Sequence, residues 1–117
     1  MEVDEYTERL ARVRQRFAST LLNKVDYSFA CLPKLSDKDY GAIETIVVIH
    51  RKLHEMCGIA PSIGFSATGL AARAAETVLR EPARSKRPLT VEEVSAFISE
   101  LNRLRAASQS DLQSMVS

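Results

Sequence analysis

Apolar residues recur at intervals of three and four along four separate stretches of this sequence, and this spacing limits the possible folds more than any other feature. The first stretch carries Tyr6, Leu10, Val13, Phe17 and Leu21. The second carries Ile43, Ile46, Ile49, Leu53, Met56 and Ala60. Such spacing puts the apolar side chains on one face of an α-helix. The pattern therefore predicts amphipathic helices that bury their apolar faces against one another.

Local signals place the ends of these helices near residues 4–31, 36–60, 65–80 and 90–108. Pro33 disfavours helical geometry in the residue before it, so the first helix is expected to end there. Ser36 with Asp39, and Thr90 with Glu93, have the spacing of N-terminal capping boxes. Pro61 and Gly64 are expected to end the second helix. The polar segment 80–88 contains two prolines and predicts a loop.

The four helices predict an all-α fold, an antiparallel four-helix bundle formed by one domain over residues 1–117. Its core is expected over residues 4–108, with 109–117 as a tail or the final helical turns. In the third helix, a stripe of mostly small residues is expected to allow close packing: Leu70, Ala71, Ala74 and Val78.

Composition narrows the classes of function. The formal net charge is +1, which argues against a chain that binds nucleic acid through its phosphates. No apolar run approaches the length of a membrane span, and the N-terminus has no signal-peptide pattern. Cys31 and Cys57 are expected to be free thiols in a reducing cytoplasm. We therefore expect a cytoplasmic monomer with no nucleic-acid or membrane partner.

His54 lies at the edge of the apolar face of the second helix. At about 100° per residue, the centre of that face is roughly 110° from His54, and His50 lies about 40° closer to it. His54 is therefore expected to be exposed, and His50 less so. Gly58 follows one turn later on nearly the same face. Because helical side chains lean towards the N-terminus, a large residue at position 58 would cover His54, whereas glycine leaves it open.

At these residues the sequence resembles the histidine-containing phosphotransfer domains of two-component phosphorelays. In that family a glycine follows the histidine at the fourth position and a second glycine follows at the tenth. An apolar residue commonly lies two positions after the histidine. The matching residues here are His54, Met56, Gly58 and Gly64, followed by Phe65 and the third helix. The helix order and lengths also fit this family over nearly the whole chain.

The resemblance implies that His54 is the phosphoacceptor of a carrier protein that has no nucleotide site or cofactor of its own. A receiver domain or a sensor histidine kinase would be its partner, and the receiver would supply Mg²⁺. No GxxxxGK[ST] motif is present, as expected for such a carrier. Val47, Arg51 and Pro61 are the candidate docking residues, and Met56 is more simply explained as a core residue.

One position departs from the family. The family has a lysine three residues after the histidine, and this sequence has Cys57. Arg51 lies one turn before His54 and is the candidate substitute, with Gly58 and Gly64 in supporting roles. An ordinary solvated arginine is the simpler interpretation of Arg51.

Two alternatives stay open from the sequence. Because the family's lysine is missing, one alternative is a phosphotransfer-like module that binds a receiver or kinase without carrying phosphate. Arg80, Arg84, Lys86 and Arg87 would then be candidate contacts for an acidic partner, although a solvated loop is the simpler explanation. The other alternative is a metal site formed by His50, His54 and Cys57, with Cys31 as a fourth ligand. It has weak support because HExxH is absent and the ligands are sparse, so no metal ligand is assigned.

Overall fold

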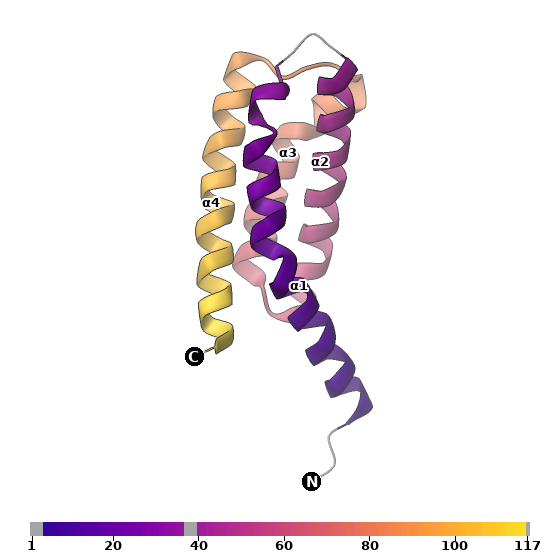
Figure 1. Cartoon of the computed structure of the whole chain (residues 1–117), viewed down its shortest axis with the longest axis vertical. Helices are drawn as coiled ribbons and strands as arrows, with labels where there is room; N and C mark the ends of the chain where they lie inside the picture. Colours follow the sequence, from indigo (N-terminus) through magenta and orange to yellow (C-terminus); the bar gives the residue numbers. More distant parts are fainter. Residues whose placement is uncertain (1–3, 37–39, 117) are drawn as a thin grey trace.

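The computed structural model describes residues 4–36 and 40–116 and forms a bundle of four α-helices (Figure 1). These are α1 (Glu5–Ala30), α2 (Tyr40–Ile59), α3 (Ser66–Ser85) and α4 (Val91–Val116). Two short 3-10 helices, η1 (Leu32–Lys34) and η2 (Ala60–Ile63), follow α1 and α2. The described residues contain no strand. The predicted all-α bundle is confirmed.

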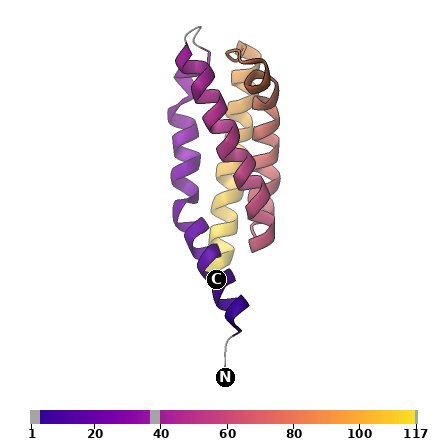
Figure 2. The same ribbon diagram turned by 90° about the vertical axis from the view of Figure 1, so that its right-hand side faces the viewer.

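Successive helices run in opposite directions, up and down the long axis (Figures 1 and 2). α2 packs against α3, α3 against α4, and α4 against α1. The N-terminal turns of α1 extend beyond the ends of the other helices, as Figure 1 shows. Tyr6 and Val13 therefore stay exposed although they continue the apolar stripe of α1.

The predicted bounds agree with the structure for α1 and for the end of α2, but not for the end of α3. α3 continues to Ser85 and contains Pro82, where a loop over 80–88 was predicted. Proline removes one backbone hydrogen bond from a helix, but Pro82 is fully buried, so burial of its ring offsets part of that loss. The helix ends instead at Lys86, which adopts a left-handed conformation with φ 52°.

The two predicted N-terminal capping boxes have different outcomes. Thr90 and Glu93 form the predicted capping box: each backbone N–H donates to the other's side chain, at 2.9 and 3.1 Å. The predicted capping box at Ser36 falls partly outside the described residues, because it requires Asp39. Residues 109–116 continue α4 as its final helical turns.

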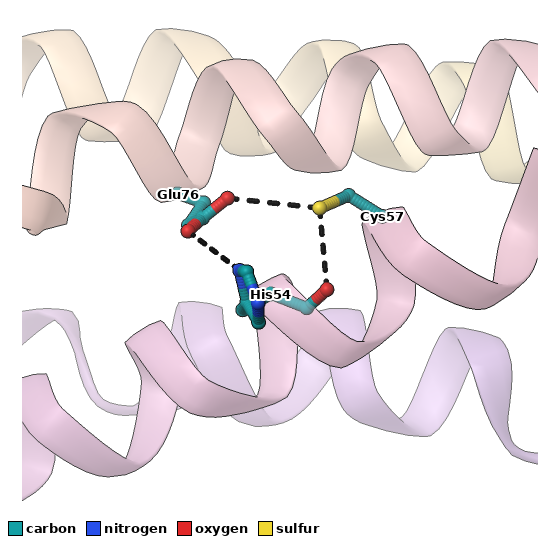
Figure 3. Close-up of side chains that lie close together, drawn as sticks. All are labelled: His54, Cys57 and Glu76. Atoms are coloured by element: carbon teal, nitrogen blue, oxygen red, sulfur yellow. Dashed lines mark hydrogen bonds and ion pairs between the residues drawn. The ribbon is translucent and has the colours of Figure 1, made fainter.

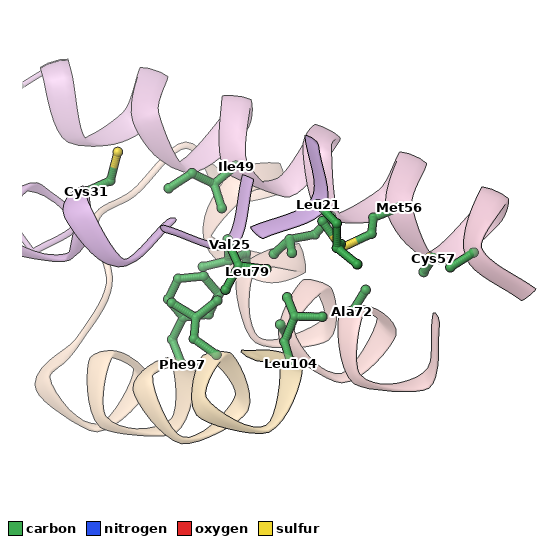
Figure 4. Packing of buried hydrophobic residues seen from close by; sticks show 14 of the residues in the cluster. Leu21, Val25, Cys31, Ile49, Met56, Cys57, Ala72, Leu79, Phe97 and Leu104 are labelled. Carbon is green, nitrogen blue, oxygen red and sulfur yellow. The ribbon is translucent and has the colours of Figure 1, made fainter. Parts of the chain in front are cut away.

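The core runs along the bundle axis and includes the buried apolar faces of all four helices (Figure 4). Met56 is buried in it, as predicted. The predicted packing stripe of α3 is wrong at Leu70, which is 72% exposed, whereas Ala71 and Val78 are partly buried against the core. The fully buried residues of α3 lie next to this stripe: Thr68, Gly69, Ala72, Ala75, Glu76, Leu79 and Pro82. Several of these residues are small, but a carboxylate lies among them.

Contacts between distant segments fix the end of the bundle where α2 turns into α3. Gly64 adopts a left-handed conformation with φ 89°, which ends η2 and reverses the chain. Asp111 of α4 accepts hydrogen bonds from the Thr68 backbone N–H and hydroxyl, both at 2.8 Å. It thus satisfies an N-terminal amide of α3 that no neighbouring side chain caps.

Across residues 4–36 and 40–116, none of the helices has both the length and the apolar character that crossing a membrane requires.

Candidate functional site

His54 lies on the outer side of α2, with 69% of its side chain exposed. His50, one turn earlier, has 25% of its side chain exposed. The predicted order of exposure for the two histidines is therefore confirmed. Their rings are stacked, with centroids 6.3 Å apart and planes 14° from parallel.

Glu76 of α3 is the residue that organises the surroundings of His54, and the sequence analysis did not assign it. Its carboxylate is buried, with 5% of the side chain exposed. Oε1 lies 2.9 Å from Nδ1 of His54, and Oε2 accepts from the thiol of Cys57 at 3.6 Å (Figure 3). Oε1 also lies 3.3 Å from Nε2 of His50, a buried atom that makes no hydrogen bond within the described residues.

The fold brings Glu76 to His54 through the close approach of α3 to α2. Gly64 turns the chain back, and Gly69 then packs directly on Pro61. A Cβ atom at position 69 would lie only 2.8 Å from Cγ of Pro61, so the small residue permits this approach. Glu76 belongs to the same buried face of α3 as Ala72 and Ala75.

Burial and hydrogen bonding act in opposite directions on Glu76. Burial by itself raises the pKa of the carboxyl, but the hydrogen bond and charge of His54, the Cys57 thiol and the charge of His50 outweigh it. The pKa of Glu76 therefore lies below its ordinary value. An ionised carboxylate only accepts hydrogen bonds, so Nδ1 of His54 carries the proton in this contact. Nε2 makes no hydrogen bond within the described residues.

Cys57 is a protonated donor in this group rather than a free thiolate. Burial, and then the adjacent Glu76 charge, raise the pKa of its thiol, while Arg73 partly opposes the rise. The thiol also donates to the backbone carbonyl of His54 at 3.2 Å. Cys57 thus occupies the space between α2 and α3.

The cations near His54, Cys57 and Glu76 come from α3. Nη2 of Arg80 lies 4.0 Å from Oε1 of Glu76, and Arg73 lies beside Cys57. The predicted substitute, Arg51, is exposed and makes no ion pair or hydrogen bond among the described residues. Two of the other arginines considered above, Arg84 and Arg87, pair with Glu81 and Glu93.

The remaining predicted residues lie around His54 in different ways. Gly58 is exposed, and a Cβ atom built on it meets nothing within 4 Å. Val47 is half-buried, and Pro61 is exposed beside Cys57 in a hollow that Leu70 and Arg73 also line. Gly64 is a turn residue, so its support of the site is through the path of the chain.

His54, Cys57 and Glu76 also have the chemistry of metal ligands. Their ligand atoms all lie within 4.8 Å of one another. The alternative metal site considered from the sequence is wrong to include Cys31 as a fourth ligand. Cys31 and Cys57 lie at opposite ends of the core in Figure 4.

Comparisons of the chain with family models, with curated proteins and with solved structures gave no match. The case for a function therefore depends on the fold, the His54 motif and the geometry around His54.

Periodicity misses Glu76 because it identifies faces within one helix, not contacts between helices. A signal was nevertheless present. Glu76 lies one residue after Ala75, four after Ala72 and three before Leu79, in the spacing of a buried face. A carboxylate on such a face is rarely buried without a partner.

Proposed function

We propose that this protein is a histidine phosphotransfer carrier that receives a phosphoryl group on His54 and passes it to a receiver-domain aspartate. The observation that carries the proposal is the exposed imidazole of His54 with its Nδ1 held by the buried Glu76 at 2.9 Å. The arrangement provides a nucleophile open to a partner and a fixed orientation of the ring. The motif resemblance described above supports the same function.

In this proposal Nε2 of His54 is the nucleophile. Its lone pair attacks the phosphorus of an aspartyl phosphate, a P–N bond forms, and the bond from phosphorus to the aspartate oxygen breaks. The aspartate leaves as a carboxylate. The Nδ1 proton stays between His54 and Glu76, and the Glu76 carboxylate stabilises the positive charge that develops on the ring.

The electrostatic role that the family gives to a lysine falls to α3 in this proposal. Arg80 is close to the His54 partner Glu76, and its side chain is 61% exposed, so its guanidinium can reach an incoming phosphoryl group. Arg73 lies on the same side of the site, beside Cys57. Both residues are better placed for this role than Arg51, which has no contact with Glu76.

A receiver domain would dock on the face of α2 that carries His54. Val47, Arg51 and Gly58 lie within about 60° of His54 around that helix. The hollow beside Cys57 adds Pro61, the exposed Leu70 and Arg73. Such a surface, with apolar residues among charged ones, suits a transient interface.

Phosphoryl transfer from radiolabelled receiver domains tests the proposal. The receiver domains of the cell that makes this protein are phosphorylated, and each is incubated with the chain and Mg²⁺. We expect an acid-labile, base-stable label on the wild type and on His50→Gln, and none on His54→Gln.

Two results would contradict the carrier function. Labelling of His54→Gln at the wild-type rate would show that His54 is not the phosphoacceptor. Stable binding of a phosphorylated receiver without any transfer would identify the non-catalytic interaction module instead.

A further inference from the structure

The His54, Cys57 and Glu76 side chains offer three different types of metal ligand from two helices. An imidazole nitrogen, a sulfur and a carboxylate oxygen lie within 4.8 Å of one another. Glu76 and Cys57 are buried, and His54 faces solvent. Nitrogen and sulfur ligands together suit zinc, whereas magnesium and calcium take oxygen ligands.

We propose that His54, Cys57 and Glu76 form a binding site for one Zn²⁺ ion, with the fourth coordination position open to solvent. The ligands would be Nδ1 of His54, Sγ of Cys57 and Oε2 of Glu76. As the zinc–sulfur bond forms, the thiol proton passes to solvent. The Nδ1 proton leaves and Nε2 takes up a proton from solvent in exchange, so the ring stays neutral as its other tautomer. The site depends on these three side chains and not on the proposed phosphotransfer.

One separation between two of the proposed ligand atoms already falls in the range that zinc requires. Tetrahedral zinc with bonds of about 2.0–2.3 Å separates neighbouring ligand atoms by roughly 3.3–3.8 Å. Sγ of Cys57 lies 3.6 Å from Oε2 of Glu76, which falls in this range. Nδ1 of His54 lies 2.9 Å from Oε1, the other oxygen of the same carboxylate, and the three ligand atoms all lie within 4.8 Å of one another.

His50 provides a second observation that favours this site. Its Nε2 is buried, approaches Oε1 of Glu76 to 3.3 Å and makes no hydrogen bond within the described residues. When zinc takes Nδ1 of His54, Oε1 loses its present donor and becomes free to accept from His50. Metal ligands commonly receive such supporting hydrogen bonds. Zinc binding would thereby satisfy a polar atom that lacks a hydrogen bond in the metal-free protein.

Zinc binding and the hydrogen bond from His54 to Glu76 exclude each other, because both use Nδ1. In the metal-bound form Nε2 would carry the ring proton, so it would have no free lone pair with which to attack phosphorus. If the proposed phosphotransfer also holds, zinc would inhibit it.

Titration of the full chain with Co²⁺, followed by displacement with Zn²⁺, tests the site without any phosphate. We expect one equivalent of Co²⁺ to produce a thiolate-to-cobalt charge-transfer band, which Zn²⁺ abolishes. Cys57→Ser should lose the band. Glu76→Gln and His54→Gln should weaken binding by at least about 100-fold, because even outer partners of metal ligands cost about 10- to 100-fold.

Cys31 is the matched control, since both thiols are free and each residue is 8% exposed. Cys31→Ser should bind like the wild type. A second test uses the wild type alone and therefore does not depend on whether a variant folds. Zinc should protect Cys57 but not Cys31 from alkylation, and peptide mass spectrometry measures the modification of each thiol. Absence of the band, or equal protection of both thiols, would overturn the proposal.

Discussion

Nδ1 of the exposed His54 on α2 donates to Oε1 of the buried Glu76 on α3 across 2.9 Å, although the two residues are 22 positions apart. The contact combines a solvent-exposed imidazole with a carboxylate that burial keeps in one place. It assigns the proton to Nδ1 and leaves Nε2 as the nitrogen with a free lone pair. The chemical proposals above start from this contact.

Removal of the Glu76 charge should slow phosphoryl transfer more than it affects folding. Glu76→Gln keeps the size of the side chain but removes the charge of the acceptor, and a hydrogen bond to a charged group is worth about 1.5–3 kcal/mol. That range corresponds to a rate loss of roughly 10- to 100-fold. Single-turnover transfer to the chain measures it. Glu81→Gln, an exposed change on the same helix, should transfer normally, and an equal loss in both variants would remove Glu76 from its positioning role.

A large side chain at position 58 should block His54 without unfolding the bundle. Gly58→Leu places Cβ in open space and raises helix propensity, so stability should stay the same or rise by up to about 1 kcal/mol. The new side chain leans towards His54, and transfer should fall about tenfold or more.

Gly41→Leu is the control for this change, because Gly41 lies in the same helix and also faces open space. It should leave transfer unchanged. A Gly58→Leu protein that accepts phosphate at the wild-type rate would show that the glycine does not serve access.

Gly69, not Gly58, is the glycine that close packing requires. A Cβ atom at position 69 would lie 2.8 and 2.9 Å from Cγ and Cδ of Pro61. Cδ of proline is bonded to the backbone nitrogen, so it cannot move aside without a shift of the main chain. Gly69→Ala should therefore destabilise the protein by about 1–3 kcal/mol in urea unfolding, despite the better helix propensity of alanine. Gly58→Ala is the matched change without a steric contact. The packing explanation fails if the two variants are equally stable.

The capping box at the start of α4 should make stability depend on pH. The Arg87 hydrogen bond is the main cause that lowers the pKa of Glu93 to about 2 from 4.5, against burial, which raises it. A carboxyl with a lowered folded-state pKa stabilises the protein above its unfolded pKa, and this contribution is lost as pH falls from about 4.5 to about 2.

Glu93→Gln isolates the charge, because glutamine can still form the capping box. The substitution should lower the free energy of unfolding by about 1–2 kcal/mol at pH 7. This value is smaller than the pKa shift alone implies, because solvent screens the partly exposed pair of Arg87 and Glu93. The difference from wild type should shrink between about pH 4.5 and pH 2. Urea unfolding across this range measures it. A difference that does not change with pH would rule out the Glu93 charge as its source.

The sequence predicted the four helices, the capping box at Thr90 and the exposure of His54, because each depends on residues close together in the chain. The end of α3 was wrong because the loop prediction took Pro82 as a helix breaker, whereas burial of its ring makes it compatible with the last turns. The centre of the buried α3 face was predicted one residue off for a related reason. Ala71, Ala74 and Val78 have the same three- and four-residue spacing as Ala72, Ala75 and Leu79, and only the packing of α3 against α2 and α4 decides between the two sets.

The candidate site was predicted only on the α2 side. His54 and Gly58 are four residues apart and share a face, which periodicity can detect. Glu76, Arg73 and Arg80 come from another helix, and their approach to His54 depends on the turn at Gly64 and on the contact between Gly69 and Pro61. Spacing within a single helix contains no information about such contacts.

The most direct test of the central claim is the identity of the phosphorylated nitrogen. The ¹⁵N-labelled chain is phosphorylated with phosphoramidate, and two-dimensional NMR of the histidine rings assigns the modified atom. Because Glu76 holds Nδ1, we predict phosphate on Nε2 of His54, with His50 unmodified and no product from His54→Gln. Phosphate on Nδ1 of His54, or modification of His50 in its place, would contradict the account.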